Sequence, residues 1–193
     1  IGTMSDLYNW QVGVTALGLL SLAICFYFVW ALPPSKHFEP RPLQFRALTK
    51  SLFQHMKDPS LMSLFAIAFM LMGSFVTLYN YIGYKLIAPP YNLSATLVGW
   101  IFIVYLVGTF SSTWFGSLST KFGRQRILYT GIFIMFSGAL LTLPSLLWIK
   151  IIGITIFTFG FFGAHSIASG WVTLRAKKDK AQASSLYLFA YYF

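Results

Sequence analysis

A short basic turn between two long apolar segments constrains this chain more than any other feature of its sequence. The flanking segments, residues 94–115 and 127–147, are each long enough to cross a hydrocarbon core of about 30 Å as a helix. The residues between them are polar and punctuated by glycine. They predict a turn at which the chain leaves a membrane and re-enters it, and they include Gly116, Lys121, Gly123, Arg124 and Arg126.

The composition excludes a water-soluble globule. Hydrophobic residues make up 57% of the chain and charged residues 9%, whereas soluble domains carry about 25% charged residues. We therefore expect an all-α polytopic membrane protein. The net charge of +10 does not indicate nucleic-acid binding, because the cations are spread over short connections instead of one soluble face. The single cysteine, Cys25, excludes an intrachain disulfide framework and is expected to be a buried, inert thiol.

Two further spans are predicted before the turn. The first covers residues 11–31 and ends at a Leu-Pro-Pro triplet, because proline cannot continue the helical hydrogen bonds. A polar connection follows, with a short amphipathic helix expected near residues 43–57 on the membrane surface. Asp58 is expected to cap the second span and Pro59 to begin it. This helix is predicted to run to about Tyr84.

The remaining apolar runs predict further spans. Ser94 is expected to cap the third, at residues 95–115, and the fourth and fifth are expected at 127–143 and 146–174. A sixth begins at Ser184 or Ser185. Since the chain does not start with methionine and stops inside this last run, we expect it to be a piece of a longer protein.

The basic residues predict the orientation of the chain. If the spans alternate, residues 32–58, 116–126 and 175–183 lie on one side of the membrane, and they hold twelve of the fourteen Lys and Arg residues. Lys85 and Lys150 lie on the other side. Because positively charged loops face the cytoplasm, we expect the basic connections to be cytoplasmic.

The fifth span has a polar face and a separate face of small residues. Thr155, Thr158, His165, Ser169 and Thr173 recur at helical spacing. A stripe of glycine and alanine lies well around the helix from them and favours close packing on another helix. We expect the polar face to line a cavity.

His165 is the ionisable residue in the middle of a predicted span. An ionisable group at membrane depth is a functional candidate, and histidine titrates near neutral pH. Two interpretations remain open. His165 contacts the substrate or a proton directly, or it is a neutral imidazole that is hydrogen-bonded to a neighbouring helix.

The second span also carries polar residues on one broad face. Thr77, Asn80 and Tyr81 are its candidates for a cavity, and a buried Asn80 would need partners for its amide. Tyr79 and Tyr84 are expected instead in an aromatic belt at the outer interface.

The third span is expected to serve mainly for packing. Gly108, Ser112 and Gly116 form a line of small residues at helical spacing. Tyr105 is its candidate for a cavity.

The sequence shows no catalytic constellation. His37 and His55 lie in a loop far from His165, and there is no paired-histidine metal spacing and no phosphate-binding loop. We expect no catalytic residue, no metal and no cofactor.

The basic turn resembles a signature of the major facilitator superfamily, G-x-x-x-D-R/K-x-G-R-R/K, which lies between the second and third helices of each half of those transporters. Thr120 stands at the Asp position and Gln125 at the final basic position of this signature, as is usual in the second-half copy. Weaker similarities support the same register. They are Trp10-Gln11 and Leu32-Pro33-Pro34-Ser35, which resemble the entry and exit of helix six, and Ser94-x-x-x-x-Gly99, which resembles the start of helix eight.

The resemblance implies a domain organisation. Residues 1–32 would be the last helix of the N-terminal half, and residues 33–58 the central cytoplasmic linker. Residues 59–193 would be helices seven to ten and the start of helix eleven in the C-terminal half. The missing N-terminal half of the same protein would then be a partner of this chain.

The resemblance also implies secondary active transport of a small molecule by alternating access, in a multi-pass protein of the bacterial inner (plasma) membrane. The nearest members are drug/proton antiporter-like, so protons and the lipid bilayer are expected partners. A non-transporting membrane scaffold or sensor with the same fold is the alternative.

The basic turn would have a part in that cycle. Gly116 would let two helices approach closely and Gly123 would allow the turn. The cations Lys121, Arg124 and Arg126 would pair with an acid, for which Asp179 is the candidate, or would anchor the turn to lipid phosphates.

Overall fold

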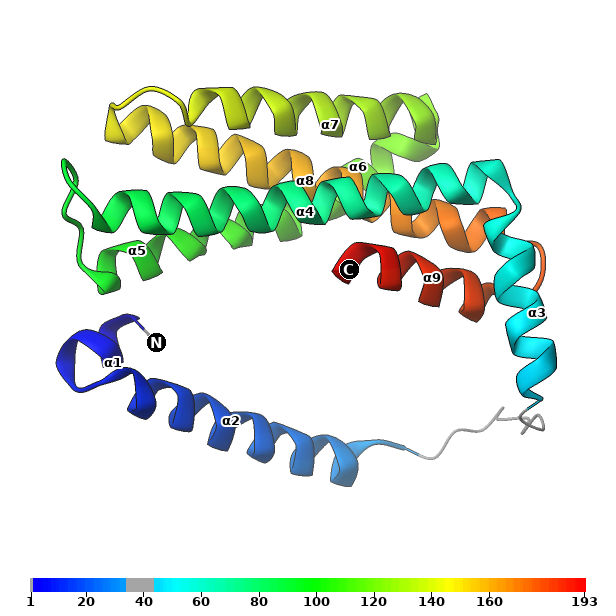
Figure 1. Ribbon diagram of the computed structural model, residues 1–193, viewed down its shortest axis with the longest axis horizontal. Helices are drawn as coiled ribbons and strands as arrows, with labels where there is room; N and C mark the ends of the chain where they lie inside the picture. The colour runs from blue at the N-terminus through cyan, green and yellow to red at the C-terminus, as the bar shows by residue number, and fades with distance from the viewer. Residues whose placement is uncertain (1, 34–43) are drawn as a thin grey trace. The chain divides into compact units, whose positions relative to one another are not determined.

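The computed structural model describes residues 2–33 and 44–193, which form helices and their connections without a β-strand (Figure 1). Among these residues, four helices are long and apolar enough to cross a membrane. The predicted all-α polytopic fold is therefore confirmed. The cations Lys36 and Arg41 and the Pro34-Ser35 part of the predicted exit lie outside the described residues. The chain divides into two compact units, residues 1–43 with 85–102 and residues 44–84 with 103–193.

The first unit contains α1 (Gly2–Leu7), α2 (Trp10–Ala31) and α5 (Ala95–Ile101), with α1 packed against α5. Asn9 begins α2, where its side-chain oxygen accepts the N–H of Val12 at 2.9 Å. Cys25 is exposed on this helix, contrary to expectation. The prediction equated an apolar run with burial in protein, whereas the side chains of α2 are largely uncovered, as suits a lipid-facing helix.

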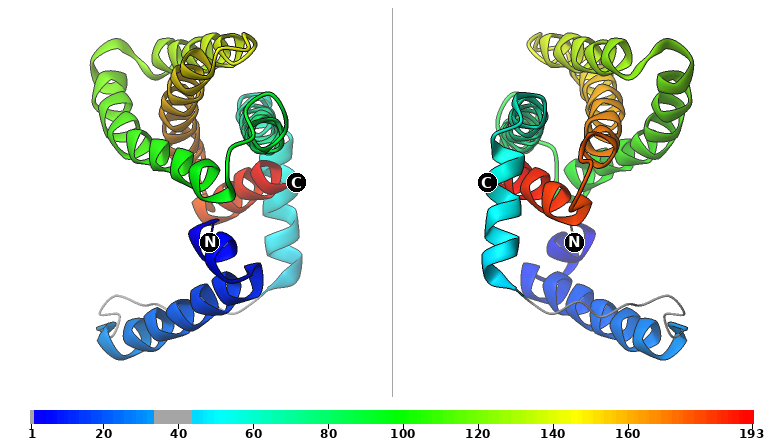
Figure 2. Two further views of the ribbon diagram at one scale, coloured as in Figure 1. Left: turned by 90° about the vertical axis from the view of Figure 1, so that its left-hand side faces the viewer. Right: turned by 90° about the vertical axis from the view of Figure 1, so that its right-hand side faces the viewer.

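The second unit is organised around one long helix, α8 (Leu147–Arg175). Helices α6 (Tyr105–Phe122) and α7 (Arg124–Leu141) pack along it, the short α9 (Lys180–Tyr192) folds back after a turn, and α4 (Pro59–Ile87) lies beside it (Figures 1 and 2). The remaining elements are α3 (Phe45–Met56), which precedes α4, and the 3-10 turn η1 (Phe102–Val104), which leads into α6.

The predicted starts at Pro59 and after Ser94 are confirmed, whereas α9 begins at Lys180 and not at Ser184 or Ser185. The Asp58 carboxylate accepts the N–H groups of Ser60 at 2.9 Å and Leu61 at 3.4 Å, so it caps α4, which begins at Pro59. Ser94 caps α5 by accepting the N–H of Leu97 at 3.3 Å. α3 forms where the amphipathic helix was expected.

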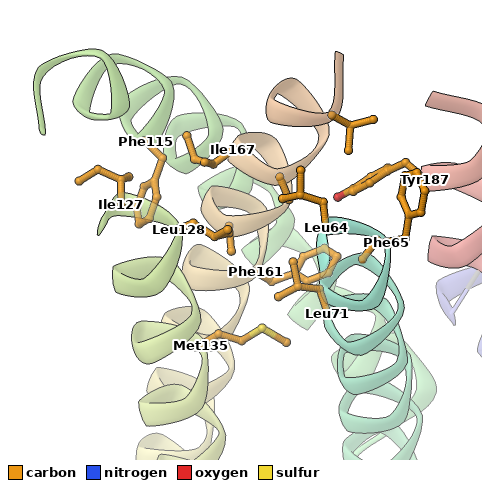
Figure 3. Close-up of a cluster of buried hydrophobic side chains, with 14 of the residues drawn as sticks. Leu64, Phe65, Leu71, Phe115, Ile127, Leu128, Met135, Phe161, Ile167 and Tyr187 are labelled. Atoms are coloured by element: carbon orange, nitrogen blue, oxygen red, sulfur yellow. The ribbon is translucent and has the colours of Figure 1, made fainter. Parts of the chain in front are cut away.

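Glycines bring the backbones of α7 and α8 together. A Cβ atom on Gly138 of α7 would lie 2.2 Å from the backbone nitrogen of Phe157, and one on Gly160 of α8 would lie 2.3 Å from that of Met135. The predicted small-residue stripe of α8 therefore packs closely on another helix, and that helix is α7. Figure 3 shows the neighbouring core, with Met135 of α7 and Leu71 of α4 on either side of Phe161.

The basic turn is much shorter than predicted. Helix α6 continues to Phe122 and α7 begins at Arg124, so Gly123 alone separates them. Its φ of +89° is readily accessible only to glycine, which explains how the chain reverses within one residue. Gly116 does not mediate the expected close approach, since a Cβ atom there would meet nothing within 4 Å among the described residues.

Within residues 44–193, the connections that were expected on one side of the membrane share one end of the second unit. The start of α4, the α6–α7 turn and the α8–α9 turn lie together there, with α3 beside them (Figure 1). We call this the basic end. α7 is not among the four helices that qualify as candidate spans, because its first turn carries Arg124, Gln125 and Arg126.

Candidate functional site

Two hydroxyl groups meet inside the apolar interface of α4 and α8. The Tyr79 hydroxyl lies 2.6 Å from Oγ1 of the fully buried Thr158. Thr158 Oγ1 donates its own proton to the carbonyl of Ile154 at 2.7 Å. Because a threonine hydroxyl has one proton, Tyr79 is the donor in the bond to Thr158. The interface thus contains a directed hydrogen bond from α4 to α8.

Aromatic rings surround this hydrogen bond. Phe75 of α4 stacks on Phe161 of α8 with ring centroids 4.0 Å apart. Tyr105 of α6 lies edge-on to Tyr79 at 5.2 Å. Such pairs contribute about 0.5–1.5 kcal/mol beyond their buried area. Side chains, not backbone contacts, therefore hold α4 against α8.

His165 continues this cluster towards α9. Its ring stacks on Phe161 at 6.0 Å and lies 4.5 Å from the ring of Tyr191. Its Nδ1 atom is 3.0 Å from the hydroxyl of Tyr187, which also lies 3.5 Å from the backbone carbonyl of His165. The structure thus contains the hydrogen bond to a neighbouring helix that the second interpretation of His165 requires.

The predicted cavity residues fall into separate groups. Tyr105, Thr158 and His165 belong to the aromatic cluster. Ser169 lies one turn beyond His165, donates to the carbonyl of Ser166 at 3.2 Å, and borders a hollow of about 300 Å³. That hollow is lined by Ser169, Gly170, Thr173, Ser184, Tyr187 and Leu188.

The candidates on α4 lie apart from this cluster. Thr77, Asn80 and Tyr81 are exposed in the structure, so the described residues do not bring them to Thr158. Tyr84 is also exposed, in keeping with its expected place at an interface. Tyr79 is not, and its assignment to the aromatic belt is wrong because its hydroxyl is engaged by Thr158.

Three tyrosines of the cluster, Tyr79, Tyr187 and Tyr191, were not predicted to belong to it. Tyr79 stands four residues after Phe75, and Tyr187 and Tyr191 form a second pair with this spacing. Pairs at this spacing lie on one helix face and were a signal that these rings belong together.

A second hollow, of about 330 Å³, lies between α4 and α7 over α8. Its lining is mainly apolar and contains none of the predicted candidates. The lining residues are Ala66, Ile67, Met70, Leu71, Ser74, Ile132, Met135, Phe136, Ala139 and Phe157.

The basic end has its own polar contacts. Ser51 of α3 donates to the Asp179 carboxylate at 2.8 Å, and Nε2 of His55 lies 3.3 Å from the Asp179 carbonyl. Asp179 therefore contacts α3, and in the described structure it forms no ion pair with Lys121, Arg124 or Arg126. The expected pairing of Asp179 with the turn cations is not seen.

The ion pair of the described residues joins Asp58 and Arg175, with 3.3 Å between Oδ2 and Nε. Partial burial raises the pKa of Asp58. The hydrogen bonds from the Ser60 amide, Arg175 and the Leu61 amide, with the charge of Arg175, outweigh that effect and lower the pKa below its usual value. The pair links the start of α4 to the end of α8.

Within residues 2–33 and 44–193, no group of three or more His, Cys, Asp or Glu side chains is placed to hold a metal ion. The cluster places one histidine and several tyrosines, all of which carry exchangeable protons, between α4, α8 and α9. Lys150 of α8 is also buried, and its ammonium group donates to the carbonyl of Thr142.

The chain is similar to a known protein family and to several known transporters. The profile of the Major Facilitator Superfamily matches residues 1–193. The MFS-type transporter YybF of Bacillus subtilis is 50% identical over 191 residues, which cover 99% of this chain and 47% of that protein. The inner membrane transport protein YnfM of Escherichia coli is 44% identical over 191 residues, which cover 99% of this chain and 46% of that protein.

A transporter of Buchnera aphidicola is 42% identical over 189 residues, with 98% of this chain and 46% of that protein covered. The chain thus spans about half the length of the curated relatives it matches. No solved structure matches it.

Proposed function

Because the chain belongs to the major facilitator superfamily, we propose that it forms part of a secondary transporter that moves a small molecule by alternating access, coupled to protons. The observation that carries this proposal is the hydroxyl and imidazole cluster inside the second unit, between Tyr79 of α4 and Tyr187 of α9. In this proposal residues 1–32 end the N-terminal half, residues 33–58 are the linker, and residues 59–193 belong to the C-terminal half.

The substrate would contact the exposed face of α4. Thr77, Asn80 and Tyr81 offer a hydroxyl, an amide and a phenol on an otherwise apolar helix. Polar groups at membrane depth are retained where they meet a partner or a water-filled cavity. An alternating-access site lies between two halves of a transporter, so a face that the described residues leave open is a suitable place for it.

The His165–Tyr187 pair is our candidate for proton coupling. When the imidazole is neutral with its proton on Nε2, Nδ1 accepts the Tyr187 O–H at 3.0 Å. When the imidazole is protonated, Nδ1–H becomes a donor, and the Tyr187 proton must turn to another acceptor. The His165 carbonyl, 3.5 Å away, is such an acceptor. Binding of one proton would therefore reverse the direction of the hydrogen bond between His165 of α8 and Tyr187 of α9.

We further propose that the basic end faces the cytoplasm of a bacterial inner membrane. The positive-inside rule supports this orientation, and the E. coli relative is named as an inner membrane transport protein. Arg124 and Arg126 are exposed in the first turn of α7, which suits a contact with lipid phosphates.

The test uses the full-length protein in proteoliposomes with a panel of labelled small molecules and an imposed pH gradient. We expect gradient-dependent movement of at least one compound, and at least a tenfold loss of it in Asn80→Ala or Tyr81→Phe. Tyr84→Phe, a change of the same kind on the same helix, should transport normally. A protein that moves none of the panel under any gradient would favour the scaffold or sensor alternative.

A further inference from the structure

Helix α3 docks through one face on the α8–α9 turn. At 3.6 residues per turn, the buried Ser51 and the half-buried Leu48, Leu52 and His55 share that face. Ser51 donates to the Asp179 carboxylate, and the His55 ring lies against the Asp179 carbonyl. These contacts fix the rotation of α3 about its axis, and therefore decide which of its residues stay open.

A second face of α3 is apolar and open. Phe45, Phe53 and Met56 are 78%, 60% and 47% exposed. Thr49 lies among them, with its hydroxyl satisfied by the carbonyl of Phe45 at 2.8 Å. These four positions span an arc of about 80°. A contiguous apolar surface of this kind marks an interaction site.

A cationic face adjoins the apolar one. Arg46, Lys50 and Lys57 follow within about the next 60° of arc. All three are exposed, and none forms an ion pair within the described part of the chain. α3 itself contains no acidic residue. The helix therefore presents an apolar strip beside three uncompensated positive charges.

α3 lies across the basic end of the second unit. Both figures show it running across the direction of α4, which is a candidate membrane span (Figures 1 and 2). A helix that crosses the end of a span in this way runs along the membrane surface. We propose that α3 is a docking helix for anionic phospholipids, with its apolar face at the acyl-chain boundary and its cations on the headgroup phosphates.

The charge of this chain favours an anionic lipid over a second copy of the chain as the occupant of this face. The chain has a net charge of +10, so a second copy would repel the cationic face. An apolar strip flanked by lysine and arginine is the pattern of interfacial helices, and anionic headgroups supply the missing negative charge.

The test uses full-length protein in nanodiscs of phosphatidylcholine alone, or of an equal mixture with phosphatidylglycerol. A fluorophore on Phe53→Cys, in a cysteine-free background, reports contact with quenchers that are carried on the acyl chains. We expect stronger quenching in the anionic nanodiscs. Each cation contributes about fivefold to binding at an anionic surface. The triple variant Arg46→Gln, Lys50→Gln, Lys57→Gln should therefore lose this gain in quenching between neutral and anionic nanodiscs.

A matched control removes the same charge from the adjacent turn, through Lys177→Gln, Lys178→Gln and Lys180→Gln, and should keep the gain. A fluorophore on Gln54→Cys, on the far side of the cations, should stay open to aqueous iodide. If the triple variant does not fold, Lys50→Gln alone should lose part of the gain.

Three results would overturn the proposal. They are equal quenching at position 53 in both nanodiscs, equal loss of the gain in the control variant, and protection of position 53 from both lipid-borne and aqueous quenchers. The last result would show that protein covers this face.

Discussion

Helix α8 uses opposite kinds of contact against α7 and against α4. Against α7 it places glycines, so that a Cβ atom on Gly160 would stand 2.3 Å from the backbone of Met135. Against α4 it places rings and hydroxyls, with Phe75 stacked on Phe161 at 4.0 Å and Tyr79 bonded to Thr158. The first interface joins two backbones, whereas the second is filled by side chains.

This difference indicates which pair can rearrange. Backbones in contact have no side chain between them that could adopt another rotamer, so α7 and α8 should behave as one rigid body. An interface of rings and single hydrogen bonds has several arrangements of similar energy, and alternating access needs such elements. The following variants test this contrast, in order of decreasing effect.

Gly160→Leu should break the rigid pair. The side chain has no room beside the backbone of Met135, and overpacking costs about 1–3 kcal/mol or more. We expect a loss of about 3 kcal/mol in the free energy of unfolding, measured by denaturant titration in detergent. Gly170→Leu on the same helix is the control, because a Cβ atom there meets nothing within 4 Å among the described residues. Similar losses in both variants would contradict the close contact.

Removing the Tyr79–Thr158 hydrogen bond should have a smaller effect. A double-mutant cycle with Tyr79→Phe and Thr158→Val should give a coupling energy of about 0.6 kcal/mol, typical of hydrogen bonds between membrane helices. Tyr84→Phe combined with Thr158→Val should show no coupling, since Tyr84 is 76% exposed. A zero value for the Tyr79 pair would mean that α4 is held by ring packing alone.

The Asp58–Arg175 pair ties the same two helices at the basic end, and should have the smallest effect. Because the folded-state pKa of Asp58 is lowered, its stabilisation is complete above the ordinary aspartate pKa of 3.8 and is lost as the pH falls through the folded-state pKa. Asp58→Asn keeps the cap and should cost less than about 1 kcal/mol at neutral pH.

The difference between Asp58→Asn and the wild type should vanish at acidic pH and shrink in high salt. Unfolding measured at several pH values checks this. A difference that grows as the pH falls would show that the carboxylate is not stabilised in the folded state.

Local rules in the sequence predicted the helices well. Asp58-Pro59 and Ser94 marked helix starts through capping chemistry that needs no tertiary context, and apolar runs marked the long helices. The extent of the turn at Gly123 was not predictable from polarity, since Ser117, Ser119 and Thr120 bond to carbonyls of their own helix and so remain helical.

The site was predicted less well, because helix periodicity gives the face of a residue but not its partner. Thr158 and His165 were found from their spacing on one helix. Tyr79 was assigned to the wrong environment, since its partner lies 79 positions away in the chain. Asp179 likewise contacts Ser51, at a separation of 128 positions, although cations stand much closer in sequence.

Proton coupling at the His165–Tyr187 pair is the central claim, and His165→Asn tests it most directly in the full-length protein. Asparagine can still hydrogen-bond to Tyr187 but cannot titrate. The measurement compares, for one transported compound, accumulation driven by a pH gradient with exchange at equal pH on both sides. We predict that the variant loses accumulation and keeps exchange. Accumulation at the wild-type level in His165→Asn would contradict the claim.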